Sequence, residues 1–154
     1  MKILIVDDNY ENRYMLETLL KGNGYGATAV RNGLQALDRL KAEPFDLIIS
    51  DILMPKMDGF QLCRTVRSDE ELRKTPFIFY TATYTDPKDV ELGLNIGADR
   101  FLIKPQDTDK ILQAITDVIS ERRDGPPSGE HLAAIRFPFR SNMDWIPLPL
   151  GAYT

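Results

Sequence analysis

Acidic, hydroxyl and basic side chains stand in this sequence where short apolar runs end. Asp7 and Asp8 follow the first run, Asp51 follows the third, Thr81 closes the fourth and Lys104 follows the fifth. Three carboxylates brought together repel one another, and each resists ionisation unless a cation offsets the charge. Mg²⁺ prefers oxygen ligands and commonly binds one or two carboxylates together with phosphate oxygens. If these residues meet, they suit Mg²⁺ and a phosphate-bearing substrate.

Asp51 is the candidate nucleophile among these residues. Covalent aspartyl phosphates form where the charge on the transferred phosphoryl group is stabilised. Mg²⁺ supplies positive charge, Lys104 adds a flexible ammonium, and the Thr81 hydroxyl can donate to a phosphoryl oxygen. The residue types therefore predict phosphoryl transfer to Asp51.

No single residue of this set carries that conclusion. An Asp-Asp pair often ends a strand or caps a helix, a β-branched Thr81 suits any strand, and Lys104 can be a solvated charge. Their joint occurrence at successive strand ends favours a functional site.

The elements that must position these residues alternate between two hydrophobic periods. The expected strands are 2–6, 27–30, 46–50, 77–81 and 100–103, and the expected helices are 10–21, 34–42, 59–68, 87–96 and 107–122. Asn32 is a candidate cap for the second helix, Asp86 and Pro87 start the fourth, and Gly97 ends it. Such alternation is typical of βαβ units in an α/β fold with a parallel sheet. Active sites of open parallel sheets lie beyond the carboxyl ends of the strands, where the polar residues fall.

Composition limits the class of protein. With 154 residues, 43% of them hydrophobic and 27% charged, the chain fits one globular domain with some chain left over. The formal net charge of -4 gives no electrostatic reason to expect nucleic-acid binding. The first apolar run is too short for a signal peptide or a membrane span, so we expect a cytoplasmic protein. Cys63 is the only cysteine, which excludes an intrachain disulfide, and we expect a half-buried thiol on a helix.

Four motifs together resemble the receiver domain of two-component response regulators, of the CheY-like superfamily. They are Val6-Asp7-Asp8, the run Asp51-Ile52-Leu53-Met54-Pro55-Lys56-Met57-Asp58-Gly59, Tyr80-Thr81-Ala82 and Lys104-Pro105. The resemblance covers residues 1–122. It implies a flavodoxin-like (βα)5 doubly wound sandwich with strand order 2-1-3-4-5, an order that is known for the family and is not obtained from the pattern.

The resemblance also implies a role for each residue of the metal site. Asp51 is the expected phosphoacceptor, Asp8 a direct Mg²⁺ ligand, Asp7 a ligand acting largely through water, and the Leu53 carbonyl a backbone ligand. The phosphoryl donor would be a sensor histidine kinase or a histidine phosphotransfer protein. The domain would be a signalling phosphoacceptor, capable of self-phosphotransfer and autodephosphorylation, and not an enzyme with a separate substrate.

A switch is expected behind the phosphoacceptor. Thr81 and Phe101 would form it, the hydroxyl moving toward the phosphoryl group and the ring turning inward. This couples the chemistry to the face of the fourth helix, fifth strand and fifth helix, through which a homodimer is possible. A cis Lys104–Pro105 bond is also expected. Leu53 and Thr83 lie at the two positions that flank the phosphoryl group in the family. Because the Leu53 side chain is apolar, it cannot orient an attacking water, so slow autodephosphorylation is expected.

Three other functions share part of this pattern. A pseudo-receiver that binds partners without phosphorylation is disfavoured by the intact acidic and Lys positions. Aspartyl phosphatases of the haloacid-dehalogenase type place a second Asp two residues after the nucleophile, where this chain has Leu53. A flavodoxin-like FMN site would need a loop after the first strand that does not repel phosphate.

The remaining residues, 123–154, are expected to be a linker and an extension without an independent fold. The run 124–129 is rich in Gly and Pro, and the last 25 residues are too few for a core of their own. This stretch could be the start of a larger output domain, an expression remnant, or an arm that docks its aromatic residues on the receiver or on a second copy.

Overall fold

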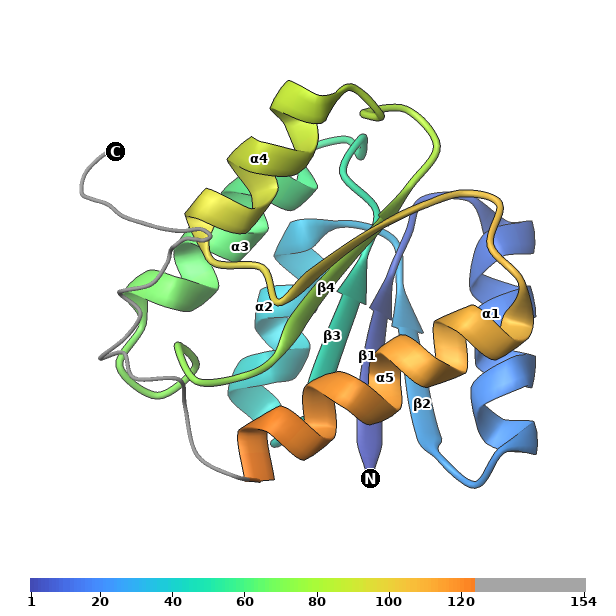
Figure 1. Ribbon diagram of the computed structural model, residues 1–154. Helices are drawn as coiled ribbons and strands as arrows, with labels where there is room; N and C mark the ends of the chain where they lie inside the picture. Colours follow the sequence, from blue (N-terminus) through green and yellow to red (C-terminus); the bar gives the residue numbers. More distant parts are fainter. Residues whose placement is uncertain (124–154) are drawn as a thin grey trace.

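A parallel five-stranded sheet lies between two layers of helices in the computed structural model, which describes residues 1–123 (Figure 1). The strand order β2-β1-β3-β4-β5 is the expected one. The elements in chain order are β1 (Lys2–Val6), α1 (Tyr10–Gly22), β2 (Gly26–Val30), α2 (Gly33–Ala42), β3 (Leu47–Ser50), α3 (Gly59–Ser68), β4 (Phe77–Thr81), α4 (Pro87–Ile96), β5 (Arg100–Ile103) and α5 (Thr108–Arg123). The α/β fold class and all ten elements are therefore confirmed.

Each face of the sheet carries its own apolar core, because successive strand residues point to opposite faces. One core joins Leu4 and Phe79 of the strands to Leu62 of α3, and α2, α3 and α4 cover that face. The other joins Ile5 to Leu16 of α1 and to residues of α5. The central strands β1, β3 and β4 are buried on both faces, as their unbroken apolar runs require.

The register brings the carboxyl ends of the strands to one edge. Val6 pairs with Val30 of β2 and with Ser50 of β3, and Thr81 pairs with Ile103 of β5. Parallel neighbours that end in register present their following loops at the same place, which is the upper edge of the sheet in Figure 1. The residues that follow β1, β3, β4 and β5 are therefore brought together.

Two strand boundaries differ from the sequence expectation by one residue. β2 begins at Gly26, because the Gly26 N–H donates to the Met1 carbonyl at 2.8 Å and extends the pairing. β3 begins at Leu47. The carboxylate of the preceding residue, Asp46, accepts a hydrogen bond of 2.8 Å from the Lys2 N–H. Both differences arise from pairing with the start of β1, which no local pattern contains.

Helix ends follow their capping residues. The Asn32 side chain accepts from the Gln35 N–H at 2.9 Å, so α2 begins at Gly33, one residue before the expected start. Pro87 opens α4, and Gly97, with φ of 127°, ends it as expected. The capping residues thus fix the start of α2 and the end of α4.

Three further expectations have an outcome here. The Lys104–Pro105 bond is cis, as expected. Cys63 lies on α3 but is fully buried, so the expectation of a half-buried thiol was wrong. Arg123, expected in the extension, is the last residue of α5, and the rest of that extension, 124–154, lies outside the described residues. Within residues 1–123, every helix is too short or too polar to cross a membrane.

Candidate functional site

Three carboxylates meet at the carboxyl edge of the sheet. Oxygen atoms of Asp7, Asp8 and Asp51 all lie within 4.8 Å of one another. Their spacing is set by the backbone, since the Asp51 N–H donates to the Val6 carbonyl at 2.8 Å and ties the end of β3 to the end of β1. The three acidic residues selected from the sequence thus form one cluster.

Lys104 completes this cluster from the end of β5. Its ammonium Nζ lies 2.8 Å from Asp7 Oδ2 and 3.1 Å from Asp51 Oδ2. The side chains of Lys104 and Asp51 are each only 11% exposed, and that of Asp7 is 3% exposed. The Lys104 N–H also donates to the Thr81 carbonyl at 2.8 Å, which aligns the ends of β4 and β5. A single partly buried cation therefore bridges the ends of β1 and β3.

The charges in this pocket shift one another's protonation. Burial raises the pKa of Asp7 above its ordinary value, although the hydrogen bond from Lys104 acts in the opposite direction. Burial alone would lower the pKa of Lys104, but its hydrogen bond to Asp7 and the charges of Asp7 and Asp51 raise it. Lys104 is therefore held as a cation, and burial makes Asp7 take up a proton more readily than an exposed aspartate does.

Backbone N–H groups orient two of the carboxylates, and one arginine holds the main chain beside one of them. The Asn9 N–H donates to Asp7 Oδ1 at 2.9 Å, and the Ile52 N–H donates to Asp51 Oδ1 at 2.6 Å. Arg13 of α1 donates from Nη1 to the Asp7 carbonyl at 2.8 Å. Sequence reasoning did not select Arg13; its position one helical turn after the acidic loop is the signal that could have indicated it. The carboxylates of Asp7 and Asp51 are thus fixed in direction before any ligand binds.

Gly59 allows the start of α3 to approach Asp51 closely. A Cβ atom at this position would lie 2.3 Å from the Asp51 carbonyl oxygen and 2.8 Å from Ile52 Cα, both backbone atoms. The Gly59 N–H donates to the Ile52 carbonyl at 2.8 Å, which closes the loop. Asp58 caps α3 through a hydrogen bond of 2.8 Å from the Gln61 N–H. The Asp-Gly pair therefore shapes the loop that carries Asp51.

The two expected switch residues lie on neighbouring strands. Thr81 is fully buried, and its hydroxyl oxygen accepts from the Thr83 N–H at 3.2 Å. Phe101 pairs with Phe79, not with Thr81, and the two rings lie 5.6 Å apart between centroids. Phe101 is half-buried against Gly93 of α4. The structure therefore connects Thr81 to Phe101 through Phe79, which lies two residues before Thr81 on the same face of β4.

Leu53 lies in the loop after Asp51, with its side chain 53% exposed. The role expected for its carbonyl as a metal ligand stays a prediction. The Leu53 side chain offers no polar atom to solvent, and Thr83, which the sequence also singled out, is exposed too.

The donor set of the cluster fits a hard divalent cation. Carboxylate oxygens of three residues meet there, and oxygen is the ligand that Mg²⁺ prefers. The Lys104 ammonium occupies part of the same cluster and offsets some of its negative charge. The arrangement can therefore hold a cation and, beside it, an anionic group at Asp51.

Comparison with known proteins places this geometry in a family. Residues 3–116 match the model of the response regulator receiver domain. The transcriptional regulatory protein GltR of Pseudomonas aeruginosa is 40% identical over 113 residues, which are 73% of this chain and 46% of that protein. The chain thus spans about half the length of the curated relatives it matches.

Solved structures agree with that match. The signal receiver domain of a signal transduction histidine kinase from Syntrophus aciditrophicus has a TM-score of 0.74 and 36% identity, over 90% of this chain and 98% of that one. A sensor histidine kinase receiver domain from Pseudomonas aeruginosa, solved with magnesium coordinated in its active site cleft, has a TM-score of 0.71 and 31% identity, over 77% and 97% of the two chains. The chain therefore belongs to the response regulator receiver domain family, a family of signalling domains.

Proposed function

We propose that this receiver domain accepts a phosphoryl group on Asp51, in a reaction that requires Mg²⁺, and passes the change to a partner or output domain. The donor is a sensor histidine kinase or a histidine phosphotransfer protein. The observation that carries the proposal is the contact of Lys104 Nζ with both Asp7 Oδ2 and Asp51 Oδ2, at 2.8 and 3.1 Å. In that contact a cation and the Asp7 carboxylate stand beside the Asp51 carboxylate, which directly follows β3.

The proposed transfer moves the phosphoryl group from a histidine nitrogen of the donor to a carboxylate oxygen of Asp51. An oxygen of the Asp51 carboxylate forms a bond to phosphorus while the phosphorus–nitrogen bond of a phosphohistidine breaks, and the leaving nitrogen keeps the electron pair. The product on this chain is a mixed carboxylic–phosphoric anhydride. Lys104 stabilises negative charge on the phosphoryl oxygens from its place beside Asp51 Oδ2. The Ile52 N–H holds the other oxygen of the carboxylate in a fixed direction.

Mg²⁺ would be held by the carboxylates of Asp7, Asp8 and Asp51 and by the Leu53 carbonyl. When bound, it supplies positive charge that offsets the charge of the phosphoryl group. Two observations support this proposal: the carboxylate oxygens lie within 4.8 Å of one another, and a related receiver domain contains magnesium in its active site cleft. Burial raises the pKa of Asp7, so a proton on this carboxyl competes with the metal.

Thr81 and Phe101 then couple the presence of the phosphoryl group to a change at the protein surface. Within residues 1–123 the Thr81 hydroxyl takes part in one hydrogen bond, as an acceptor, so its proton is available to a phosphoryl oxygen. Movement of the hydroxyl would vacate space next to Phe79, against which the Phe101 ring packs. The face of α4, β5 and α5 would change with that ring.

Hydrolysis of the phosphoryl group is proposed to be slow. The Leu53 side chain is exposed and apolar beside the phosphoacceptor loop, so it cannot hold a water in line for attack. Self-phosphotransfer from small phosphodonors and autodephosphorylation both belong to this proposal.

The test is intact-mass spectrometry of the chain after incubation with a small phosphodonor, with and without Mg²⁺. One phosphoryl adduct is expected in the presence of Mg²⁺, and none is expected for Asp51→Asn. Asp38→Asn is the control, because Asp38 is an exposed carboxylate on α2. If no adduct forms although Mg²⁺ binds, the chain is a binding module that acts without phosphorylation.

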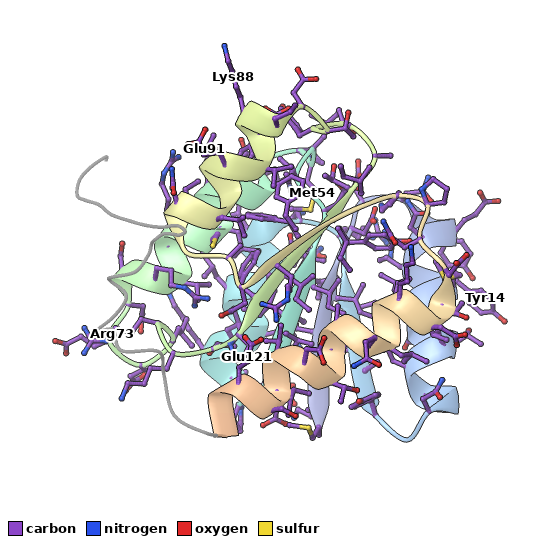
Figure 2. The ribbon with its side chains drawn as sticks, in the orientation of Figure 1. Tyr14, Met54, Arg73, Lys88, Glu91 and Glu121 are labelled. Atoms are coloured by element: carbon purple, nitrogen blue, oxygen red, sulfur yellow. The ribbon has the colours of Figure 1, made fainter. Side chains whose placement is uncertain are left out.

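A homodimer through the face of α4, β5 and α5 is a further part of the proposal. Leu92 and Leu94 of α4 are 40% and 37% exposed, and Figure 2 shows Lys88 and Glu91 projecting from the same helix. Sedimentation with and without a phosphoryl mimic tests it, and identical monomer profiles in both states would count against it. A net charge of -4 supports the related proposal that this chain does not itself bind nucleic acid.

A further inference from the structure

The ammonium group of Lys104 lies over the aromatic ring of Tyr80. Tyr80 belongs to β4 and is 4% exposed, and its ring centroid is 5.3 Å from Lys104 Nζ. A cation over the face of a ring, within about 6 Å of the centroid, is attracted by the negative charge of that face. This contact adds to the two ion pairs that Lys104 makes with Asp7 and Asp51.

Strand geometry explains how the ring comes to face the ammonium. Tyr80 pairs with Leu102 of β5, and both belong to the core that α1 and α5 cover. Side chains two residues apart along a strand point to the same face, so Lys104 follows Leu102 on that face. Asp7 follows Ile5, another member of this core, in the same way. Tyr80 therefore lies where the apolar core ends and the charged cluster begins.

The ring, more than the hydroxyl, makes the contact with the site. The Tyr80 hydroxyl oxygen accepts from the Gln106 N–H at 3.4 Å, which is longer than the usual 2.7–3.2 Å of an N–H···O bond. The Gln106 side chain has its own closer bond, from Nε2 to the Ile103 carbonyl at 2.9 Å. Loss of the hydroxyl alone is therefore expected to change the loop after β5 very little.

The surroundings of the pair make an aromatic residue matter at this position. The Lys104 side chain is 11% exposed, and the attraction between a cation and a ring is larger where water is excluded. Ile78, two residues earlier on the same face of β4, fills the same core with an aliphatic side chain. An aliphatic residue at position 80 would fill the core too, but it would present no negative face to the ammonium.

The ring contact differs from the ion pairs in its response to a bound cation. Any metal held by the carboxylates of Asp7 and Asp51 competes with the Lys104 ammonium for their oxygens. The Tyr80 ring has no net charge and is buried, so it presents the same face to the ammonium with or without that metal. The ring can therefore keep the ammonium in place when both ion pairs weaken.

We propose that Tyr80 is a positioning residue, whose ring holds the Lys104 ammonium beside Asp51 Oδ2 while the carboxylates bind Mg²⁺. The inference rests on the phosphoacceptor function proposed for Asp51. Stabilisation of charge on a phosphoryl group is most effective when the stabilising cation is already in place before the reaction. Tyr80 acts through Lys104 and not on the reacting atoms.

The first measurement detects the contact without any phosphoryl transfer. Because Lys104 Nζ lies over the ring, its neighbouring ε-methylene protons are expected to resonate upfield of those of Lys110, an exposed lysine of α5. Nuclear magnetic resonance of the full chain is expected to show this displacement with and without Mg²⁺. Tyr80→Phe should keep the displacement, and Tyr80→Leu should lose it.

The second measurement is the rate of phosphoryl adduct formation from a small phosphodonor at saturating Mg²⁺. Tyr80→Leu is expected to lower this rate about tenfold, which corresponds to loss of a partly desolvated cation–ring contact. Tyr80→Phe is expected to stay within about twofold of the wild type, because only the long hydrogen bond is lost. Phe77→Leu is the matched control, since it removes a fully buried ring of β4 from the other core. It should leave the rate and the Lys104 resonances unchanged.

Ring fluorination keeps the test independent of folding defects in the leucine variant. Phenylalanines with increasing numbers of ring fluorines, placed at position 80, weaken the negative face of the ring with little change in its shape. The rate of adduct formation is expected to fall with each added fluorine.

Other results overturn the proposal. Lys104 resonances that are not displaced in the wild type, or that stay displaced in Tyr80→Leu, show that the ring does not hold the ammonium. A rate that is indifferent to fluorination shows that Tyr80 only fills the core. Failure of the wild type to form any adduct would instead contradict the phosphoacceptor function, and the Lys104 resonances in Mg²⁺ would still decide whether the ring holds the ammonium.

Discussion

Lys104 and Asp7 are 97 positions apart in the chain, and their charged atoms lie 2.8 Å from each other. The pair links β5 to β1 although β3 and β4 lie between them in the sheet. Both side chains are nearly buried, at 11% and 3% exposed, so solvent screens the pair weakly.

Replacement of Lys104 by Met is therefore expected to destabilise the metal-free protein. Removal of one partner leaves a buried carboxylate without its cation, at a cost of about 3 kcal/mol. Mg²⁺ replaces part of the missing charge, so it should raise the unfolding midpoint of the variant more than that of the wild type. Denaturant unfolding with and without Mg²⁺ measures both effects.

The matched control for this variant is Lys110→Met, which removes an exposed lysine from α5. Its unfolding free energy is expected to stay within about 0.5 kcal/mol of the wild type. Equal losses in the two variants would show that the Lys104 bridge does not stabilise the fold.

Gly93 of α4 is expected to control the position of the Phe101 ring. A Cβ at this position would lie 2.8 Å from Phe101 Cδ2 and 3.1 Å from Phe79 Cδ2. Gly93→Ala gains about 1 kcal/mol of helix propensity, but overpacking costs about 1–3 kcal/mol. We therefore expect a net loss of about 1 kcal/mol and displaced Phe101 ring resonances, measured by unfolding and by aromatic nuclear magnetic resonance.

Gly22→Ala is the control for the gain in propensity. Gly22 ends α1, and a Cβ there would meet no atom within 4 Å. Its variant should be as stable as the wild type or more so. If Gly93→Ala proved equally favourable, with Phe101 unmoved, the close contact would not limit the ring.

The sequence predicted the elements and the acidic cluster because both depend on local patterns. The strand ends carried Asp51 and Lys104, and the sheet rule brought them to one edge. The contacts that support the site were not predictable in this way. Arg13 of α1 donates to the Asp7 carbonyl only because α1 packs beside the end of β1. Gly93 contacts Phe101 only because α4 packs on β5. Those contacts depend on helix packing angles, which hydrophobic period alone does not determine.

Arg67 is another contact that local patterns do not contain. From α3 it donates to the carbonyl of Gly97 at 2.9 Å and to that of Thr75 at 2.6 Å, and it pairs with Asp99 at 3.3 Å. It therefore joins the end of α3 to the loop before β4 and to the loop after α4. Arg67→Ala is expected to cost about 3 kcal/mol in unfolding free energy, because Asp99 is largely buried.

Arg67→Lys separates charge from geometry. The lysine keeps one positive charge but lacks the planar fork that reaches several acceptors at once, so it should recover only part of the loss. Arg64→Ala, which removes an exposed arginine from the same helix, is expected to change stability by less than about 0.5 kcal/mol. Full recovery in the lysine variant would show that charge alone matters.

The Cys63 thiol is expected to be unreactive in the folded protein. It is fully buried, and burial raises its pKa to about 12, so thiolate is scarce at neutral pH. Labelling with a disulfide reagent should follow the opening of the α3 face and should slow when Mg²⁺ and a phosphoryl mimic stabilise the fold. Labelling of native protein at the rate of a free thiol would contradict this burial.

The affinity for Mg²⁺ is expected to depend on the protonation of Asp7. Burial raises the pKa of Asp7 above its ordinary value of 3.8, so this carboxyl is still partly protonated at pH values where an exposed one is ionised. In the metal-free protein the raised pKa contributes stability at low pH that is lost as pH rises through it. Mg²⁺ competes with that proton, so the rise in unfolding midpoint caused by Mg²⁺ should grow with pH over the same window.

Asp7→Asn tests whether this pH dependence comes from Asp7. The amide has no titrating proton, so the variant should bind Mg²⁺ more weakly and with a flatter dependence on pH across the window above 3.8. Mg²⁺ titrations of both proteins, followed by the unfolding midpoint at several pH values, give the comparison. A dependence as steep in the variant as in the wild type would show that the competing proton is not on Asp7. Asp7 would then act on the metal through its fixed position, held by the Asn9 N–H and Lys104, and not through its charge state.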